Sequence, residues 1–422
     1  MKLISTSSRN AKAQLAALFA RRSLTYERAL PAARRIVNAV RSGGDAALRR
    51  YATRLDRISP HSPLLISSDE LVVACDSAPS RFTSALQTAS RNIRAFAQRQ
   101  LPKEWDISPV RGMSVGQRVR PLDAVGCYVP GGRYPLPSTL LMTVIPAQVA
   151  GVQRIVVASP NPAPEILAAA AMLGITEFYR VGGAQAIAAL AYGTQTISPV
   201  DKIVGPGNAY VTAAKKLVAF DCAIDMLAGP TEIVVTSENG NPEWIAADLV
   251  AQAEHDPDAV AIFVTTSATM ASTVAAEAKR QSRSNPTARE AILRNGLIIV
   301  TRTLDEAHQI TNSLAPEHLT VDGDADLAWV RNAGSVFVGP YSAQPLGDYI
   351  SGPNHTLPTA GLARVRGGLS IADFLKVITV QQYQPDGLRR LGPAAISLAE
   401  AEGLEGHAKA IRARLSDIRG AR

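Results

Sequence analysis

Gln252 and His255 are the first side chains whose types and spacing could do chemistry. They stand three residues apart in a stretch with helical periodicity, so on a helix they would share one face and converge on one point. A neutral amide oxygen and a neutral imidazole would supply half of a metal site that still accepts water or substrate oxygens. The simpler alternative is a histidine that caps carbonyl groups where Pro257 ends the helix.

An acid and a base stand side by side at Glu317 and His318. They follow Pro316, which ends a helical run, and adjacent side chains in irregular backbone are expected to diverge. One of the two could therefore accept a proton while the other activates a water molecule, which is general acid–base chemistry.

Two further pairings of an acid with an imidazole lie closer to the C-terminus. Asp348 and His355 fall in one glycine-rich stretch of the kind that forms functional loops, and Glu402 and His407 lie on a helical tail. Each has a plain structural alternative, because a loop aspartate often forms a turn and a tail histidine is often solvated. We therefore treat all four as candidate site residues.

The composition fits a globular protein of more than one domain. The chain has 422 residues, of which 46% are hydrophobic and 19% charged. Its net charge of +8 comes from scattered basic residues without interleaved aromatics, so no nucleic-acid partner is expected. No apolar run is long enough for a membrane span, and the N-terminus turns polar too early for a signal peptide. With three widely spaced cysteines, these features predict a cytoplasmic protein without a disulfide framework.

Strand-like and helix-like stretches alternate over residues 121–217, a pattern typical of a doubly wound parallel sheet. Three strand-to-helix turns carry glycines: Gly131-Gly132, Gly182-Gly183 and Gly205 with Gly207. Phosphates bind at such turns, but none of the three completes the dinucleotide fingerprint. On spacing alone, a nucleotide site and ordinary tight turns remain equal alternatives.

A second α/β pattern covers residues 224–364, with strand-like stretches at 232–236, 260–264, 297–300 and 335–338. Residues 1–105 and the tail from about residue 369 have mainly helical periodicity, including a run at 373–377. The predicted fold class is α/β, with two doubly wound sheets and helical segments at both ends. The apolar positions of the tail could bury against a partner chain.

Several long motifs together resemble the histidinol dehydrogenase family. They are GGAQAIAALAYG at 182–193, DKIVGPGN at 201–208, AGPTE at 228–232, QAEH at 252–255, APEHL at 315–319 and NHTLPT at 354–359. The likeness runs in order along essentially the whole chain. It implies an NAD-dependent, zinc-binding enzyme that oxidises L-histidinol through the aldehyde to L-histidine, in the last steps of histidine biosynthesis.

The resemblance also assigns roles to residues of this chain. His318 would take the proton of the alcohol, and Glu317 would activate water for the second oxidation. The zinc ligands of the family, which binds one ion per subunit, match Gln252, His255, Asp348 and His407. Substrate contacts match these four, Glu317, Thr231, His355 and Glu402. NAD contacts match Tyr128, Gln185 and Asn208.

The family is a homodimer whose C-terminal tail reaches into the neighbour's site. By this resemblance, Glu402 and His407 would act across the interface, and the active sites would be shared. Residues 21–124 with 230–370 would form a first Rossmann-like domain carrying the zinc and substrate site. Residues 125–229 would form a second one that binds NAD, and residues 1–20 and 371–422 would be small helical dimerisation segments.

Two alternatives remain open from the sequence. The stretch GGRYP at 131–135 also resembles relatives that oxidise other small alcohols, such as sulfonated diols. Arg133 in that stretch could pair with a phosphate or with an anionic substrate. The other alternative is a catalytically inactive paralogue, although all the metal and acid–base positions carry competent residues.

Overall fold

The structure is a computed structural model that describes residues 1–10, 13–14, 26–131 and 134–420. The chain divides into two compact units: unit 1 is Met1–Gln100 with Leu122–Phe374, and unit 2 is Leu101–Pro121 with Leu375–Arg422. Two parallel sheets form the framework of unit 1, which confirms the α/β fold predicted from the alternating pattern. Among the described residues, no helix combines the length and the apolar character needed to cross a membrane.

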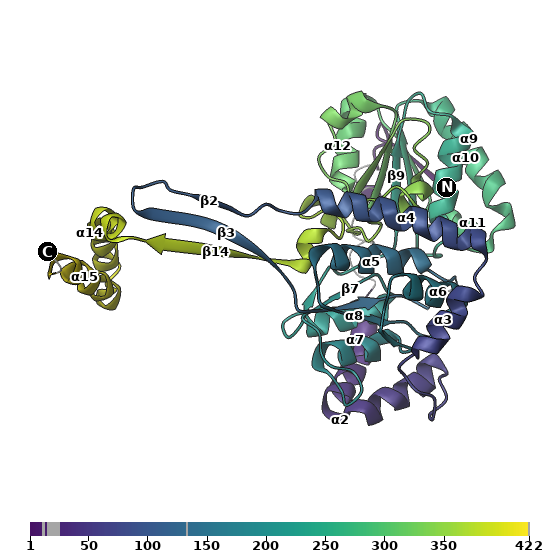
Figure 1. Ribbon diagram of the computed structural model, residues 1–422. Helices are drawn as coiled ribbons and strands as arrows, with labels where there is room; N and C mark the ends of the chain where they lie inside the picture. The colour runs from purple at the N-terminus through teal and green to yellow at the C-terminus, as the bar shows by residue number, and fades with distance from the viewer. Residues whose placement is uncertain (11–12, 15–25, 132–133, 421–422) are drawn as a thin grey trace. The chain divides into compact units, whose positions relative to one another are not determined.

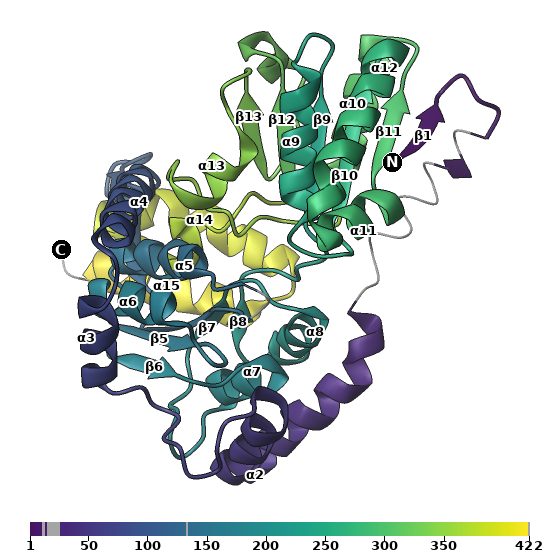
Figure 2. The same cartoon turned by 90° about the vertical axis from the view of Figure 1, so that its right-hand side faces the viewer.

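The first sheet of unit 1, which includes β9 (Figure 1), has six parallel strands. Their order, β1-β11-β10-β9-β12-β13, can be followed in Figure 2. The strands are β1 (Lys2–Ser5), β9 (Glu232–Thr236), β10 (Val260–Thr265), β11 (Leu297–Val300), β12 (His318–Val321) and β13 (Ser335–Val338). The helices among them are α9 (Pro242–Ala253), α10 (Ala268–Gln281), α11 (Pro286–Arg294), α12 (Leu304–Leu314) and α13 (Gln344–Tyr349). Every residue of β9 is buried, which explains its continuous rather than alternating apolar sequence.

The second sheet of unit 1 has five parallel strands in the order β6-β5-β4-β7-β8. The strands are β4 (Ala124–Tyr128), β5 (Arg154–Ala158), β6 (Glu177–Tyr179), β7 (Lys202–Val204) and β8 (Ala223–Ile224). Its helices are α5 (Pro137–Ala150), α6 (Pro164–Met172), α7 (Gly183–Tyr192) and α8 (Ala209–Val218). Figure 2 shows that the two sheets occupy separate parts of unit 1, each with its own helices.

The N-terminal helices make their main helix contacts with the helices of the second sheet. Helix α2 (Leu30–Asp56) packs on α7 and α8, α3 (Ser68–Asp76) on α6, and α4 (Ser80–Arg99) on α5. This packing differs from our assignment of residues 21–124 to the domain of the first sheet, because the apolar face of α2 joins the core around Val156 and Ile187. The exact domain boundaries stay a prediction.

Unit 2 contains an antiparallel sheet in the order β14-β3-β2, formed by β14 (Leu375–Tyr383), β3 (Met113–Pro121) and β2 (Trp105–Ile107). Strand β14 pairs with β3 along its whole length. Helices α14 (Pro385–Ala401) and α15 (Glu405–Gly420) follow and pack on each other.

Three stretches differ from the sequence predictions. The helical run expected at 373–377 gives way to β14, because the β-branched run from Val377 to Val380 favours a strand. Residues 2–5, expected in a helical segment, form edge strand β1 beside β11, and residues 11, 12 and 15–20 of that segment lie outside the described residues. Strand β12 was missed because its four residues follow a proline-interrupted turn.

A buried ion pair in the second sheet's core yields a stability prediction. Lys215 donates to the Asp225 carboxylate and to the Gly205 carbonyl (3.0 Å), and both charged side chains are almost fully buried. Lys215→Met leaves the Asp225 charge without its partner, so we expect the free energy of unfolding to fall by about 3–5 kcal/mol in urea titrations. The matched control is Lys216→Met at the exposed neighbour, which should cost less than about 1 kcal/mol. Equal losses of unfolding free energy in Lys215→Met and Lys216→Met would contradict a special role of the buried ion pair in stability.

Candidate functional site

Seven of the residues predicted to bind substrate or metal or to act in catalysis line one cavity of about 420 Å³ in unit 1. They are Thr231, Gln252, His255, Glu317, His318, Asp348 and His355. The cavity lies at the amino ends of β9 and β12, since Thr231 precedes β9 and His318 begins β12. Its other wall includes Pro130 and Gly205, which follow the carboxyl ends of β4 and β7. The site is therefore formed by the amino edge of one sheet and the carboxyl edge of the other.

Glu317 is a buried carboxylate held by two donors. Ala315 ends α12 in the left-handed conformation (φ 45°), and the chain then turns through Pro316 into β12. Oε2 of Glu317 accepts hydrogen bonds from the Thr231 hydroxyl (2.6 Å) and the Glu232 amide (2.7 Å). Burial nevertheless raises the pKa of Glu317 to about 7, so near neutral pH this group can exchange a proton in either direction.

His318 is also buried, and its hydrogen bonds define which nitrogen is free. Nδ1 lies 3.1 Å from the Glu232 carbonyl, which can only accept, so Nδ1 carries the proton of the neutral ring. Nε2 is buried without a hydrogen-bond partner and lies 3.6 Å from Oδ1 of Asp348. Nε2 is therefore the nitrogen that can accept a proton from a molecule in the cavity.

The two adjacent side chains converge, contrary to the divergence predicted for irregular backbone. Nδ1 of His318 lies 3.6 Å from Oε2 of Glu317, because the bonds to Thr231 and Glu232 hold both groups against the start of β9. Burial alone would lower the pKa of His318, but the nearby carboxylates of Glu317 and Asp348 outweigh it and raise that pKa. Positive charge on the ring is thus stabilised from two sides.

Asp348 and His355 form a second connected pair. Burial would raise the pKa of Asp348, but the His318 ring outweighs it, so the pKa is lowered and the carboxyl group stays ionised. Its Oδ2 accepts from Gln344 Nε2 (2.9 Å), and its main-chain carbonyl accepts from His355 Nδ1 (2.8 Å). Nε2 of His355 then accepts from the Thr139 hydroxyl (3.2 Å), and burial lowers the pKa of this histidine, which favours the neutral ring.

Gln252 and His255 each present one unused acceptor atom. Gln252 Nε2 donates to the Thr231 hydroxyl, and Oε1 is buried without a hydrogen-bond partner. Nδ1 of His255 donates to the Ala251 carbonyl (3.1 Å), so the lone pair of Nε2 remains available. The predicted shared helical face of Gln252 and His255 does not form. Helix α9 ends at Ala253, and His255 lies in the turn that follows the helix.

Three of the four residues predicted to bind metal lie in unit 1, and they provide an amide, an imidazole and a carboxylate: Gln252, His255 and Asp348. Within the part of the chain that the structure describes, no group of three or more His, Cys, Asp and Glu side chains is placed to hold a metal ion. Glu402 and His407 belong to unit 2, where Glu402 caps α14 and His407 lies in α15, both exposed. The donor set of unit 1 fits zinc in chemistry, since it combines oxygen and nitrogen ligands.

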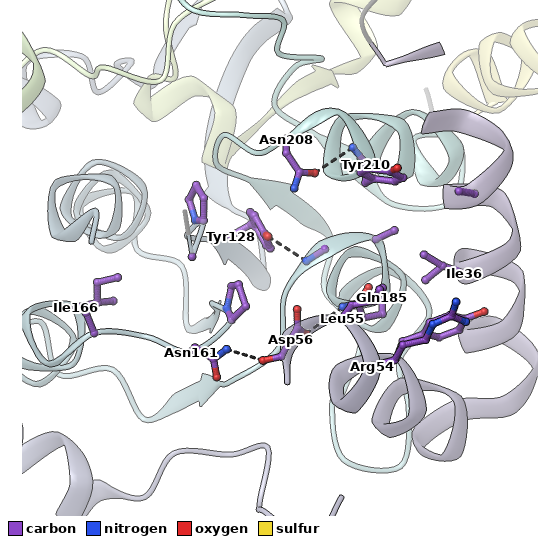
Figure 3. A pocket seen from close by; sticks show the side chains of 18 of the residues that line it. Ile36, Arg54, Leu55, Asp56, Tyr128, Asn161, Ile166, Gln185, Asn208 and Tyr210 are labelled. Atoms are coloured by element: carbon purple, nitrogen blue, oxygen red, sulfur yellow. Dashed lines mark hydrogen bonds between the residues drawn. The ribbon is translucent and has the colours of Figure 1, made fainter. Parts of the chain in front are cut away.

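The three predicted NAD contacts line a larger cavity of about 940 Å³ (Figure 3). Tyr128 accepts a hydrogen bond from the Gly183 amide (3.0 Å), and Oδ1 of Asn208 caps α8 by accepting from Tyr210 and Val211. The Gln185 side chain is completely buried. Pro130 and Asn208 line both cavities, so the two spaces adjoin within unit 1.

Sequence reasoning missed three residues that hold these side chains. Thr139 contacts His355, Gln344 contacts Asp348, and Asp56 contacts Gln185 over a separation of 129 residues. None of the three lies in an acid–imidazole cluster or a glycine turn, and only the fold brings them to the site. Arg133 lies outside the described residues.

Comparisons with known proteins agree along the whole chain. The model of a family described as histidinol dehydrogenase matches residues 19–415. A histidinol dehydrogenase from Gluconobacter oxydans is 45% identical over 98% of this chain and 99% of its own length. One from Geobacillus kaustophilus is 49% identical over 90% of this chain and 92% of its own. The crystal structure of histidinol dehydrogenase from Elizabethkingia anophelis has a TM-score of 0.92 and 34% identity, covering 99% of both chains.

Proposed function

Since this chain belongs to the histidinol dehydrogenase family of oxidoreductases, we propose that it oxidises L-histidinol through L-histidinaldehyde to L-histidine, using two molecules of NAD. The observation that carries the proposal is the buried Glu317–His318 pair, in which Nε2 of His318 has no hydrogen-bond partner and the side chain lines the cavity. The reaction would form the last steps of histidine biosynthesis, in the cytoplasm.

In the first oxidation, His318 acts as the general base. Its Nε2 accepts the hydroxyl proton of histidinol. NAD, the second substrate, takes up the hydride from the carbon that bears this hydroxyl group. The imidazolium that results is stabilised by Glu317 on one side and Asp348 on the other. The proton is then released to solvent, and the aldehyde stays in the site.

In the second oxidation, Glu317 activates water. Its pKa of about 7 lets it take a proton from a water molecule that adds to the aldehyde carbon, and the donors Thr231 and Glu232 keep its carboxylate in place. A second NAD accepts the hydride of the hydrated aldehyde. Overall, one water is consumed and two hydrides leave the substrate, which accounts for the four electrons.

A zinc ion, one per subunit, fits the unused acceptor atoms of this site. Gln252, His255 and Asp348 would hold it together with His407, and the buried, unpartnered Oε1 of Gln252 supports that role. Such an ion would orient the amine and imidazole of the substrate and would not itself be redox-active. Thr231, His355 and Glu402 would complete the substrate contacts.

NAD would occupy the larger cavity, with Tyr128, Gln185 and Asn208 as contacts. Each of the two parallel sheets would then belong to a Rossmann-like domain, the second of which binds the nucleotide. We further propose that the protein is a homodimer whose C-terminal segment, residues 371–422, enters the partner's site. This would bring Glu402 and His407, which belong to unit 2, to the site of the partner.

The function is tested by the NADH formed per molecule of L-histidinol. With zinc and excess NAD, we expect two NADH for the wild-type protein and about one for Glu317→Gln, because the glutamine cannot activate water. His318→Ala should lose activity by about 10²–10⁴-fold, as expected for removal of a general base.

The matched control is His61→Ala, at an exposed loop position outside both cavities, which should still give two NADH. Absence of NADH from histidinol with the folded wild-type protein would contradict the proposed substrate. Small anionic diols would then be the compounds to screen.

The shared site is tested by mixing inactive subunits. His318→Ala and His407→Ala homodimers should each be inactive, but mixed dimers contain one site in which both residues are intact. After mild dissociation and reassociation of equal amounts, we expect about a quarter of the wild-type activity, because half of the dimers are mixed and each has one working site. If activity stays at the background of the separate variants, the tail does not cross to the partner.

A further inference from the structure

The N-terminus of helix α7 is occupied by a carboxylate of the chain itself. Oδ2 of Asp56, the last residue of α2, accepts hydrogen bonds from the Gly182 amide and from Gln185 Nε2, each at 3.0 Å. Asp56 is buried, and its carbonyl accepts from the Asn161 amide. Figure 3 shows Asp56 and Gln185 facing each other at the wall of the larger cavity.

This arrangement leaves the N-terminus of α7 poorly suited to bind a phosphate. In doubly wound folds, the diphosphate binds to the free amides at the N-terminus of a helix that follows a strand. Here the Gly182 amide donates to Asp56, and the Gly183 amide donates to Tyr128. A diphosphate at this turn would find two of its donors taken and would lie against a negative charge, which repels it.

The same carboxylate determines the orientation of the Gln185 amide. An ionised carboxylate can only accept hydrogen bonds, so the NH₂ group of Gln185 must face Asp56. Oε1 is then directed away from Asp56, and it is completely buried without a partner in a side chain that lines the cavity. A buried acceptor of this kind is costly unless a ligand donates to it.

The position of Gln185 indicates which half of NAD lies beside it. The nicotinamide ring must reach His318, which lines the smaller cavity, and Pro130 with Asn208 forms the border between the two spaces. Gln185 lines only the larger cavity. The adenosine half, which carries a 6-amino group and ribose hydroxyls as donors, is therefore the part that remains for Gln185.

We propose that Asp56 is a positioning residue that orients the Gln185 amide so that Oε1 accepts a hydrogen bond from the adenosine half of NAD. At α7, the protein thus recognises a hydrogen-bond donor of the nucleotide and does not bind its phosphates. This inference rests on the proposed function in naming NAD as the ligand.

A double-mutant cycle on nucleotide affinity tests the proposal. Dissociation constants for NAD and for ADP-ribose, which lacks nicotinamide, are measured by calorimetry on the full-length protein. Gln185→Met should weaken both about tenfold, as expected for loss of one hydrogen bond to a buried acceptor. Asp56→Asn should weaken both about threefold to tenfold, because an amide at this position no longer dictates which way Gln185 points. In the double variant, Asp56→Asn should add less than twofold, since its effect acts through Gln185.

Three results would overturn the proposal: unchanged affinity in Asp56→Asn, additive effects in the cycle, or a loss for NAD that ADP-ribose does not share. Asp221→Asn, which alters an exposed aspartate outside the cavity, is the matched control and should change neither constant. If Asp56→Asn does not fold, Asp56→Ser takes its place, with the same expected losses. The dissociation constants are measured without histidinol, so they do not depend on whether the protein oxidises histidinol. Conversely, a negative result in the double-mutant cycle would not contradict the proposed oxidation.

Discussion

The site depends on one buried line of hydrogen bonds at the amino edge of the first sheet. It runs from Gln252 Nε2 to the Thr231 hydroxyl and on to Glu317, while His318 bonds to the neighbouring main chain at Glu232. Since buried polar groups must be paired, this line settles which atom of each side chain is used internally. Oε1 of Gln252 and Nε2 of His318 are left without a hydrogen-bond partner, and in the proposed function they serve a metal ion and a proton.

The same pairing of buried polar groups places internal carboxylates at two other positions in unit 1. At the carboxyl edge of the first sheet, the Glu238 and Asn239 amides donate to Asp322, and at α7 the Gly182 amide donates to Asp56. Internal carboxylates thus occupy positions where a doubly wound fold would normally hold an anion. The reactive groups instead gather at the amino ends of β9 and β12, opposite the edge that the fold class alone would indicate.

Much of the fold was predictable because the strands of both sheets are dense in Val and Ile. The alternation of strands and helices over residues 121–217 was confirmed, including the glycine turns that precede α7 and α8. Strand β12 and strand β14 were not predicted, because each depends on pairing with a distant strand. Strand β12 has only four residues, and strand β14 is exposed on both faces, so neither has the alternation of buried and exposed positions that marks a half-buried strand.

The candidate site was predictable as a set of residue types, but its electrostatics was not. The motifs pointed to Glu317 and His318, yet their convergence depends on Thr231 and Glu232, which come from a different strand. The roles of Asp56 and Gln344 could not be found from the sequence, because each acts through a single contact that folding creates. Local sequence shows which side chains can react, whereas tertiary structure decides which of their atoms are free.

In the proposed function, metal binding and proton transfer are carried out by separate groups. The zinc content of variants tests this separation most directly. Measured after loading and exhaustive dialysis, zinc should be near one per chain in the wild-type protein and in His318→Ala. It should be lost in His255→Ala and in Gln252→Leu, which remove the two unused acceptor atoms. Zinc lost from His318→Ala but retained in the other two variants, or a wild-type protein that cannot be loaded, would contradict the account.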